Sequence, residues 1–518
     1  MEVRSLHKDF PVLQTDVALG LEFCFILPLE NDSKRRCEGP SPDQQFSMPF
    51  RKPLVIIYLV DGARPDVMLE LLESGDLPNI RKEIFAPGTF RAATSCFPST
   101  TGPAYLPFLM GCFPGTANLP GMRWLDKAEF HRKRWGRNSF RSYMGYEAPW
   151  LNDDLSKDHP SLHEILPRSF NVYSMITRGL PKHRDLTRAV KLPLYSRAHF
   201  THQWRPVDHA AHKYLLRGLE EEPEFIFVVF PGVDAYSHLT HPRHEEVLTA
   251  YRFVDFSVGQ VVEKLKSSGR WDDTLLLLTS DHGLSATHRH FDLAMFLQNR
   301  GMKTLFYPLV WKKNPAASVM ISGNAMGHVY CLNGKSGVAL QGDELPHALG
   351  SVWEELLQRE EVDFVAWRGD GHSYEIVSAR GRATIIRHAL GLTYHPRTGD
   401  PFGLGELASP MNLQEALAET FHSDYPDALE QIEQLFASGR TGDLVVSSKI
   451  GCDLREAYEW PEHHSSHGSL HREHMMVPLL YNQTGWDERP ARTTDVFNTV
   501  LKWSGKPTLE NTDGQPLC

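Results

Sequence analysis

The stretch "LVIIYLVDGARPDVMLELLESG" (residues 54–75) decides the fold class of this 518-residue chain. Leu54–Val60 form a continuous, largely β-branched run of strand length, which is typical of a strand buried on both faces. Asp61-Gly62 follows at once, and the next residues predict a helix with a proline near its start and Gly75 at its end. Parallel sheets are built from such units of strand, polar turn and helix.

The same order recurs later in the chain. "FIFVVF" (225–230) runs into "PGVDAYSH" and a long segment with an apolar stripe of helical period, and "TLLLLT" (274–279) runs into "SDHG". "VPLLY" (477–481) precedes "TTDVFNTVLKWSG", which predicts a helix capped by Thr494 or Asp495. The fold class predicted is therefore α/β, with a mostly parallel sheet between two layers of helices. Functional residues of such sheets gather in loops at the carboxyl ends of the strands.

Changes in composition divide the chain into four predicted segments. Residues 1–50 end in a polar stretch rich in proline and serine and form an N-terminal extension. Residues 51–300 and 461–518 carry the strand and helix pattern and form the two parts of one α/β core. Residues 301–460 contain short mixed strands and a Pro/Gly-rich loop, which predicts an inserted α+β cap subdomain.

Composition limits the classes of partner. The chain has 41% hydrophobic residues, 23% charged residues and a net charge of −10 without a basic stripe, which argues against a nucleic-acid partner. Its seven scattered cysteines contain no CxxC pair and indicate a reducing compartment. Glu22 interrupts the apolar stretch near the N-terminus, and no run approaches about 18 apolar residues. We expect a cytoplasmic protein with no membrane partner, and the oligomeric state is left open.

Carboxylate and imidazole side chains gather in four polar loops. They are Asp61 in "LVDG", Asp234 and His238 in "PGVDAYSH", Asp281 and His282 in "TSDHG", and His467 in "SSHGSL". Each of them, taken alone, is compatible with a turn, a helix cap or a solvated loop. Together, three aspartates and three histidines fit two divalent metal ions, with zinc favoured and manganese the alternative. Two ions about 4 Å apart would bind the attacking and leaving oxygens of a phosphoryl displacement.

In this order and context, these motifs resemble the alkaline phosphatase superfamily, and within it the type I phosphodiesterase/nucleotide pyrophosphatase branch. The resemblance covers roughly residues 52–290 and 462–505. It implies an alkaline phosphatase-like fold and metal-dependent hydrolysis of a phosphodiester or pyrophosphate bond in a small-molecule phosphoester. It also implies one metal ion bound by Asp234, His238 and His467, and a second bound by Asp61, Asp281, His282 and the nucleophile.

The nucleophile is sought in "SCFPSTTGPAYLPFLMG" (residues 95–111). Members of this superfamily place it ten residues before the glycine that ends its helix, and the matching Gly111 selects Thr101. The resemblance then implies that Thr101 binds metal, attacks phosphorus and forms a covalent phosphothreonine. Ser99 and Thr100 are alternatives. Cys96 is a further alternative, because "CFPST" is similar to the sulfatase motif and would imply a sulfatase.

"GMRWLD" (residues 121–126) departs from the resemblance. Met122 stands where the relatives carry an asparagine that contacts a phosphate oxygen. We expect Arg123 or Asn118 to bind the substrate instead, with Arg123 as a catalytic donor. A guanidinium there would favour a more highly charged phosphate group, so a phosphomonoesterase is the alternative activity. Arg123 is equally compatible with a salt bridge.

Overall fold

The computed structural model of the chain describes residues 52–145, 147–334, 337–455 and 459–518. The chain from Arg51 to Cys518 forms one compact unit, and the predicted extension over residues 1–50 lies outside the described residues. Among the described residues, no helix combines the length and the apolar character that crossing a membrane requires.

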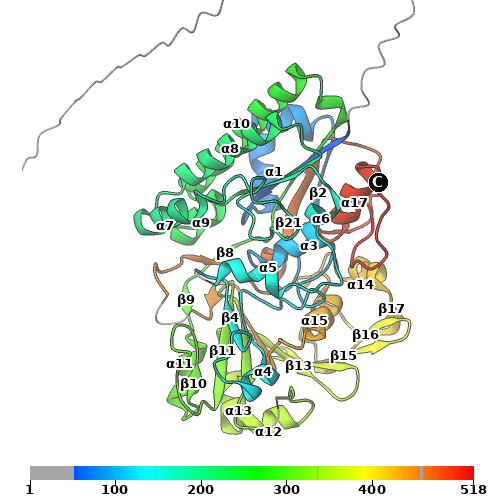
Figure 1. Cartoon of the computed structure of the whole chain (residues 1–518). Coiled ribbons are helices and arrows are strands. Elements are labelled where there is room, and N and C mark those ends of the chain that lie inside the picture. The colour runs from blue at the N-terminus through cyan, green and yellow to red at the C-terminus, as the bar shows by residue number, and fades with distance from the viewer. Residues whose placement is uncertain (1–51, 146, 335–336, 456–458) are drawn as a thin grey trace, which may run out of the picture. The chain divides into compact units, whose positions relative to one another are not determined.

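A seven-stranded sheet forms the first part of the fold (Figure 1). Its strands lie in the order β22 (Ala491–Arg492), β2 (Thr89–Thr94), β21 (Met476–Tyr481), β7 (Thr274–Thr279), β1 (Leu54–Val60), β6 (Phe225–Phe230) and β5 (Ser169–Val172). The strands β7, β1, β6 and β5 are parallel, and Val55 of β1 pairs with Phe225 on one side and Leu275 on the other. β21 runs antiparallel to both of its neighbours, β7 and β2. The sheet is therefore mostly parallel, as predicted.

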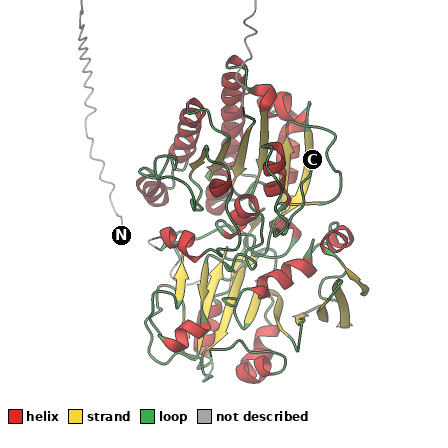
Figure 2. Cartoon of the chain, turned by 45° about the vertical axis from the view of Figure 1, so that its right-hand side comes forward, coloured by secondary structure: helices red, strands yellow, loops and turns green. Residues whose placement is uncertain are grey.

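Helices cover both faces of this sheet (Figure 2). On one face, the hydroxyl of Tyr58 lies 3.4 Å from Ser257 Oγ of α10 (Glu245–Ser267). On the other face, the ring of Phe227 packs against Tyr105 and against Phe108 of α3 (Leu106–Met110). The other helices of this part are α1 (Pro65–Ser74), α2 (Pro78–Ile80), α5 (Leu151–Asp154), α6 (Leu162–Ile165), α7 (Lys191–Thr201), α8 (Arg205–Glu220), α9 (Gly232–Leu239), α16 (Arg472–Met475) and α17 (Asp495–Trp503).

A second, nine-stranded sheet lies between residues 304 and 448 and is almost entirely antiparallel. Its order is β10 (Thr304–Leu305), β11 (Ala317–Ser322), β12 (Met326–Cys331), β18 (Leu444–Ser448), β13 (Val362–Arg368), β14 (Ser373–Ser378), β15 (Gly381–His388), β16 (Gly391–Gly399) and β17 (Leu407–Met411). Its helices are α11 (Leu293–Asn299), α12 (Glu344–Leu349), α13 (Ser351–Leu357), α14 (Leu413–Thr420) and α15 (Ala428–Ala437). We call this second sheet and its helices the cap.

The shorter elements complete the two parts. They are α4 (Lys127–Arg132) and the two-stranded pairs β3 (Arg123–Leu125) with β4 (Phe140–Ser142), β8 (Ser285–Ala286) with β20 (Ser465–Ser466), and β9 (Arg289–His290) with β19 (Cys452–Asp453).

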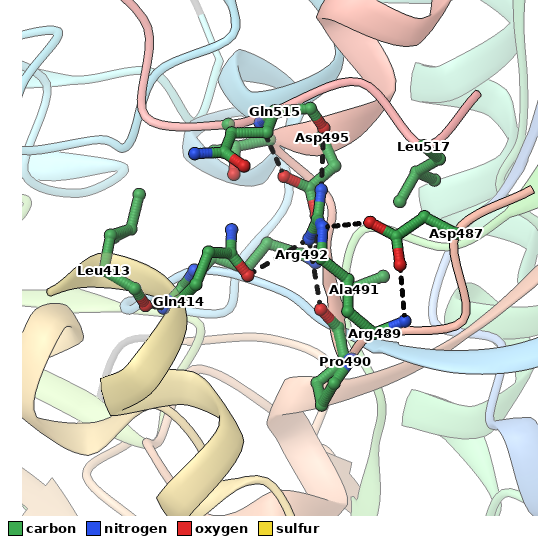
Figure 3. Close-up of polar contacts among 12 residues, drawn as sticks. Leu413, Gln414, Asp487, Arg489, Pro490, Ala491, Arg492, Asp495, Gln515 and Leu517 are labelled. Carbon is green, nitrogen blue, oxygen red and sulfur yellow. Dashed lines mark hydrogen bonds and ion pairs between the residues drawn. The ribbon is translucent and has the colours of Figure 1, made fainter.

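A buried ionic joint ties the cap to the first sheet. Arg492 of β22 binds Asp427 at the start of α15 through two hydrogen bonds of 2.7 and 2.6 Å, and both side chains are fully buried. Beside it, Arg489 Nη1 donates to Gln414 of α14 and to Asp495 of α17 (Figure 3). The charge of Arg492 is tolerated at this depth because the opposite charge of Asp427 compensates it.

The structure confirms the predicted fold class and adjusts some details. The helix predicted from the opening stretch is α1, which ends at Gly75 with φ of +87°. α17 begins at Asp495 with Thr494 in the cap position, but the Thr494 hydroxyl donates to Asp513 O rather than to the helix. The segment boundaries expected at residues 300 and 460 stay predictions.

Candidate metal centre and active site

Three aspartates meet at one edge of the first sheet because their strands are neighbours. Asp61 follows β1, Asp281 follows β7, and Asp234 lies in α9 directly after β6. Parallel strands present their carboxyl ends at the same edge, so the three loops converge there. The topology therefore produces the cluster that the motif order suggested.

His467 reaches the same edge from the opposite direction. It precedes β21, and the antiparallel course of β21 brings its beginning to the edge where β1, β6 and β7 end. The pairing of β20 with β8 then places the loop of His467 beside the loop of His282. The two imidazole rings stack with their centroids 3.6 Å apart and their planes 9° apart.

The six side chains form two groups of three. Asp234, His238 and His467 make one group, and Asp61, Asp281 and His282 make the other. Within each group the candidate ligand atoms all lie within 4.8 Å of one another. These groups have the same composition as the two ligand sets that the sequence resemblance implies.

The three histidines share one orientation. Nδ1 of His238 lies 2.7 Å from Ser465 O, Nδ1 of His282 lies 3.1 Å from Gly283 O, and Nδ1 of His467 lies 2.9 Å from Ser99 O. A carbonyl oxygen can only accept, so each Nδ1 carries a proton, and in the neutral ring each Nε2 then presents a lone pair. The Nε2 atoms point at carboxylates: His238 Nε2 lies 3.3 Å from Asp234 Oδ1, and His282 Nε2 lies 3.4 Å from Asp61 Oδ1. Backbone carbonyls that hold imidazoles in this tautomer are typical of metal sites.

Asp61 and Asp281 are buried, Asp234 is partly buried, and these carboxylates are incompletely bonded. Oδ1 of Asp234 and Oδ2 of Asp281 are buried without a hydrogen-bond partner. Burial raises the pKa of Asp61 well above its ordinary value, and repulsion by Asp281 and Asp234 raises it further. Unpaired lone pairs and mutually repelling carboxylates are costly unless a cation neutralises them. The donor set of carboxylate oxygens and imidazole nitrogens fits divalent metal ions.

Thr101 lies against the second of these groups. Its hydroxyl oxygen is 3.3 Å from Asp61 Oδ1 and 3.2 Å from His282 Nε2. Four residues further on, Tyr105 donates to Asp61 Oδ2 at 3.2 Å. Sequence reasoning did not select Tyr105, because the turn at Gly102, with φ of +90°, separates it from Thr101 and no regular spacing relates the two side chains.

Two of the alternative nucleophiles, Ser99 and Cys96, point elsewhere. Ser99 Oγ donates to Ser469 O at 2.8 Å. The Cys96 thiol faces the carbonyl of Pro98 and packs in a small apolar cluster with Ala104 and Phe113. Burial raises the pKa of the Cys96 thiol far above its ordinary value. Cys96 therefore lacks the exposure and the thiolate character of a reactive cysteine.

The residues expected to bind the phosphate have protein partners of their own. Arg123 Nη1 is 3.3 Å from Glu459 Oε1, so the salt-bridge interpretation of Arg123 matches this geometry. The Asn118 amide accepts from Ser438 Oγ of the cap at 2.9 Å. Met122 packs beside the nucleophile instead, because a Cβ added at Gly102 would lie 2.8 Å from Met122 Sδ. The roles of Arg123 and Asn118 in substrate binding stay predictions.

Solved structures share this fold at low sequence identity. A phosphonoacetate hydrolase from Sinorhizobium meliloti, in complex with phosphonoformate, superposes with a TM-score of 0.54 and 16% identity, covering 88% of this chain and 97% of that chain. A murine ectonucleotide pyrophosphatase/phosphodiesterase 5 superposes with a TM-score of 0.53 and 13% identity, covering 88% and 96%. These likenesses establish the fold and nothing further.

Sequence comparison identifies the family. A bis(5'-adenosyl)-triphosphatase, enpp4, from Xenopus laevis is 20% identical over 264 residues, which are 48% of this chain. The chain thus spans 50% of the length of that relative. Residues 55–470 match the family described as type I phosphodiesterase / nucleotide pyrophosphatase. The chain belongs to this family of metal-dependent phosphoester hydrolases.

Proposed function

We propose that this protein hydrolyses a phosphodiester or pyrophosphate bond at a two-metal site, through a covalent phosphothreonine on Thr101. Asp234, His238 and His467 would hold one divalent ion, and Asp61, Asp281 and His282 with Thr101 would hold the other. Zinc is the ion we propose, with manganese as the alternative, because mixed carboxylate and imidazole ligands suit both. When bound, such ions supply positive charge to the attacking and leaving oxygens.

The shared tautomer of the three histidines is the observation that carries this proposal. Each imidazole is fixed by a backbone carbonyl and turns its Nε2 lone pair toward buried carboxylates. Histidines that served only as hydrogen-bond donors to those carboxylates would need a proton on Nε2. Protonation of all three rings is opposed in at least one case, because burial and the nearby His282 lower the pKa of His467 well below its ordinary value.

The chain's own residues can then be given roles in the reaction. The Thr101 hydroxyl donates to Asp61 Oδ1 and its oxygen lies 3.2 Å from His282 Nε2, so the oxygen is held against the second group of candidate ligands. Attack by this oxygen forms the bond to phosphorus as the bond to the leaving oxygen breaks. Water then cleaves the phosphothreonine and restores the hydroxyl. Fixing the nucleophile in this way reduces the entropy lost on reaching the transition state.

The partner we propose is a small phosphoester, and the name of the Xenopus relative suggests a diadenosine polyphosphate as a first substrate to test. Phosphomonoester hydrolysis is the alternative activity. Sulfatase activity through Cys96 is disfavoured by the burial of its thiol in an apolar cluster. The cytoplasmic location stays a prediction.

A panel of substrates tests the proposal. Bis(4-nitrophenyl) phosphate, 4-nitrophenyl phosphate, 4-nitrophenyl sulfate and diadenosine triphosphate would be compared at equal enzyme and metal concentrations. We expect the diester and the triphosphate to have the highest kcat/KM, and a chelator to abolish turnover. Full activity after exhaustive chelation would overturn the metal-dependent mechanism, and a preference for the monoester would select the alternative.

A further inference from the structure

Helix α15 of the cap holds the backbone of the loop that carries Thr101. The Phe97 N–H donates to Gln431 Oε1 at 2.8 Å, and the Phe97 carbonyl accepts from Gln434 Nε2 at 2.6 Å. Phe97 is fully buried and lies in an irregular segment after β2, where no neighbouring strand bonds its backbone. Buried backbone groups need partners, and two side chains of one helix supply both of them.

The two glutamines are themselves held by further hydrogen bonds. Gln431 Nε2 donates to Asp427 Oδ2 at 2.8 Å, and Gln434 Oε1 accepts from the Gly115 N–H at 2.8 Å. Their side chains are 0% and 2% exposed. Gly115 touches the helix so closely that an added Cβ would lie 1.7 Å from the Gln434 carbonyl oxygen. α15 therefore fits against this loop in one register.

The same loop is held on its other side by the metal centre. The Ser99 carbonyl binds His467 Nδ1 at 2.9 Å, and Ser99 Oγ accepts from the Gly468 N–H at 3.2 Å. The segment between Phe97 and Thr101 thus joins the glutamines of the cap to a candidate metal ligand. Asp427 continues the connection to the first sheet, because it binds both Gln431 and Arg492.

We propose that Gln431 and Gln434 are positioning residues, through which the cap sets the backbone from which Thr101 reaches the substrate. This inference rests on the proposed role of Thr101 as nucleophile. Methionine or leucine would fill the same volume without burying an amide, so packing alone does not require glutamine at either position. A nucleophile displaced by about 1 Å can lose on the order of 100-fold in rate, so holding this loop in place affects catalysis directly. We call Gln431 and Gln434 the clamp.

The test compares Gln434→Met and Gln431→Met with a matched control, Gln414→Met. Gln414 also lies in a cap helix and accepts one hydrogen bond across the joint, from Arg489, but it does not bond the Thr101 loop (Figure 3). With bis(4-nitrophenyl) phosphate we expect kcat to fall about 10- to 100-fold in the two clamp variants. KM and bound metal should stay within about twofold of wild type, and the control should keep its kcat.

Backbone hydrogen exchange gives a readout that does not depend on turnover. Amides of residues 95–105 should exchange faster in Gln434→Met than in Gln414→Met or wild type, because only the first variant releases Phe97. Equal kcat values and equal exchange in the clamp and control variants would overturn the proposal.

A second substitution separates the two bonds of Gln434 and serves if the methionine variant fails to fold. Gln434→Glu keeps an acceptor for Gly115 but has no donor for the Phe97 carbonyl at neutral pH. We expect its kcat to fall as in Gln434→Met, and a wild-type kcat would overturn the clamp. Thr101→Ala tests the nucleophile separately from the clamp. If that variant turns over normally, Thr101 is not the nucleophile, whatever the effect of the glutamine substitutions.

Discussion

The imidazole rings of His282 and His467 stack face to face, with centroids 3.6 Å apart, and each belongs to a different group of candidate ligands. One ring comes from the loop after a parallel strand and the other from the loop before an antiparallel strand. The stack is therefore the point of contact between the two halves of the metal centre. A change at either ring is expected to be felt at both groups.

Metal content is the first prediction. His238→Ala should lower the bound metal from two ions to one per chain, because His238 belongs to one group only. His467→Ala should also lower the affinity of the remaining ion, by roughly 10-fold, because the ring that supports His282 is lost. Elemental analysis after dialysis and chelator competition measure both effects. His290→Ala, which alters a histidine paired with Asp453 outside the groups, is the control and should keep both ions.

The identity of the nucleophile gives the second prediction. Thr101→Ala should lower kcat by at least about 1,000-fold, whereas Thr101→Ser should retain measurable turnover because a hydroxyl remains beside Asp61 and His282. Thr100→Ala and Cys96→Ser should stay near wild type. Circular dichroism would show that the fold is intact in each variant. Loss of activity in Cys96→Ser alone would instead point to the sulfatase alternative.

Tyr105 supports Asp61 from behind the site. Tyr105→Phe removes the hydrogen bond to Asp61 Oδ2 while keeping the buried ring. We expect metal affinity at neutral pH to fall about 10-fold, since the carboxylate loses a donor that stabilises its charge. Added metal at high concentration should restore kcat, because the nucleophile itself is unchanged. Failure of excess metal to restore activity would argue against this role.

The burial of Asp208 leads us to predict that the free energy of unfolding depends on pH. Its carboxylate is buried in α8 and accepts from the Gly232 N–H at the start of α9 at 3.1 Å. Burial raises the pKa of Asp208 to about 7 in the folded protein, against about 4 in an unfolded chain. As pH rises, the unfolded chain therefore loses this proton before the folded protein does. Between about pH 4 and 7, Asp208 lowers the free energy of unfolding by up to about 1.4 kcal/mol per pH unit.

Asp208→Asn isolates this effect, because the amide cannot ionise and still accepts from Gly232. Urea unfolding at pH 5 and pH 8, in chelator so that metal binding does not contribute, should show a smaller loss of stability in the variant. An identical loss in both proteins would contradict the assignment.

The ionic joint between Arg492 and Asp427 gives a prediction about folding rather than catalysis. Arg492→Met leaves the Asp427 carboxylate buried without its cation and should lower the free energy of unfolding by about 3–5 kcal/mol. The double variant Arg492→Met/Asp427→Asn should recover part of this loss, because the stranded charge is also removed. Denaturant titration measures both variants, and a double variant less stable than Arg492→Met would refute the explanation.

Much of the fold could be predicted because its signals are local. Leu54–Val60, 225–230 and 274–279 are apolar runs long enough for buried strands, and each is followed by an acidic loop. Once these strands are parallel neighbours, Asp61 and Asp281 must approach each other. The motif order, together with the family resemblance, was therefore enough to single out the candidate metal ligands.

The parts that escaped prediction depend on tertiary contacts. The direction of β21 follows from its pairing with β2 and β7, which no local pattern records. The partner of Arg123 in its salt bridge is Glu459, a residue far along the chain that no local pattern indicates. Gln431 and Gln434 look like polar positions on an ordinary helix, and only the packing of α15 against the loop of Phe97 reveals their bonds.

The position of β21 between β2 and β7 also bears on how the protein is made. A ribosome releases β2 and β7 long before β21, so the nascent sheet has a central gap until the C-terminal part of the chain emerges. His467 emerges with that same part. The complete sheet and the last of the six candidate ligands therefore become available together, late in the synthesis of the chain.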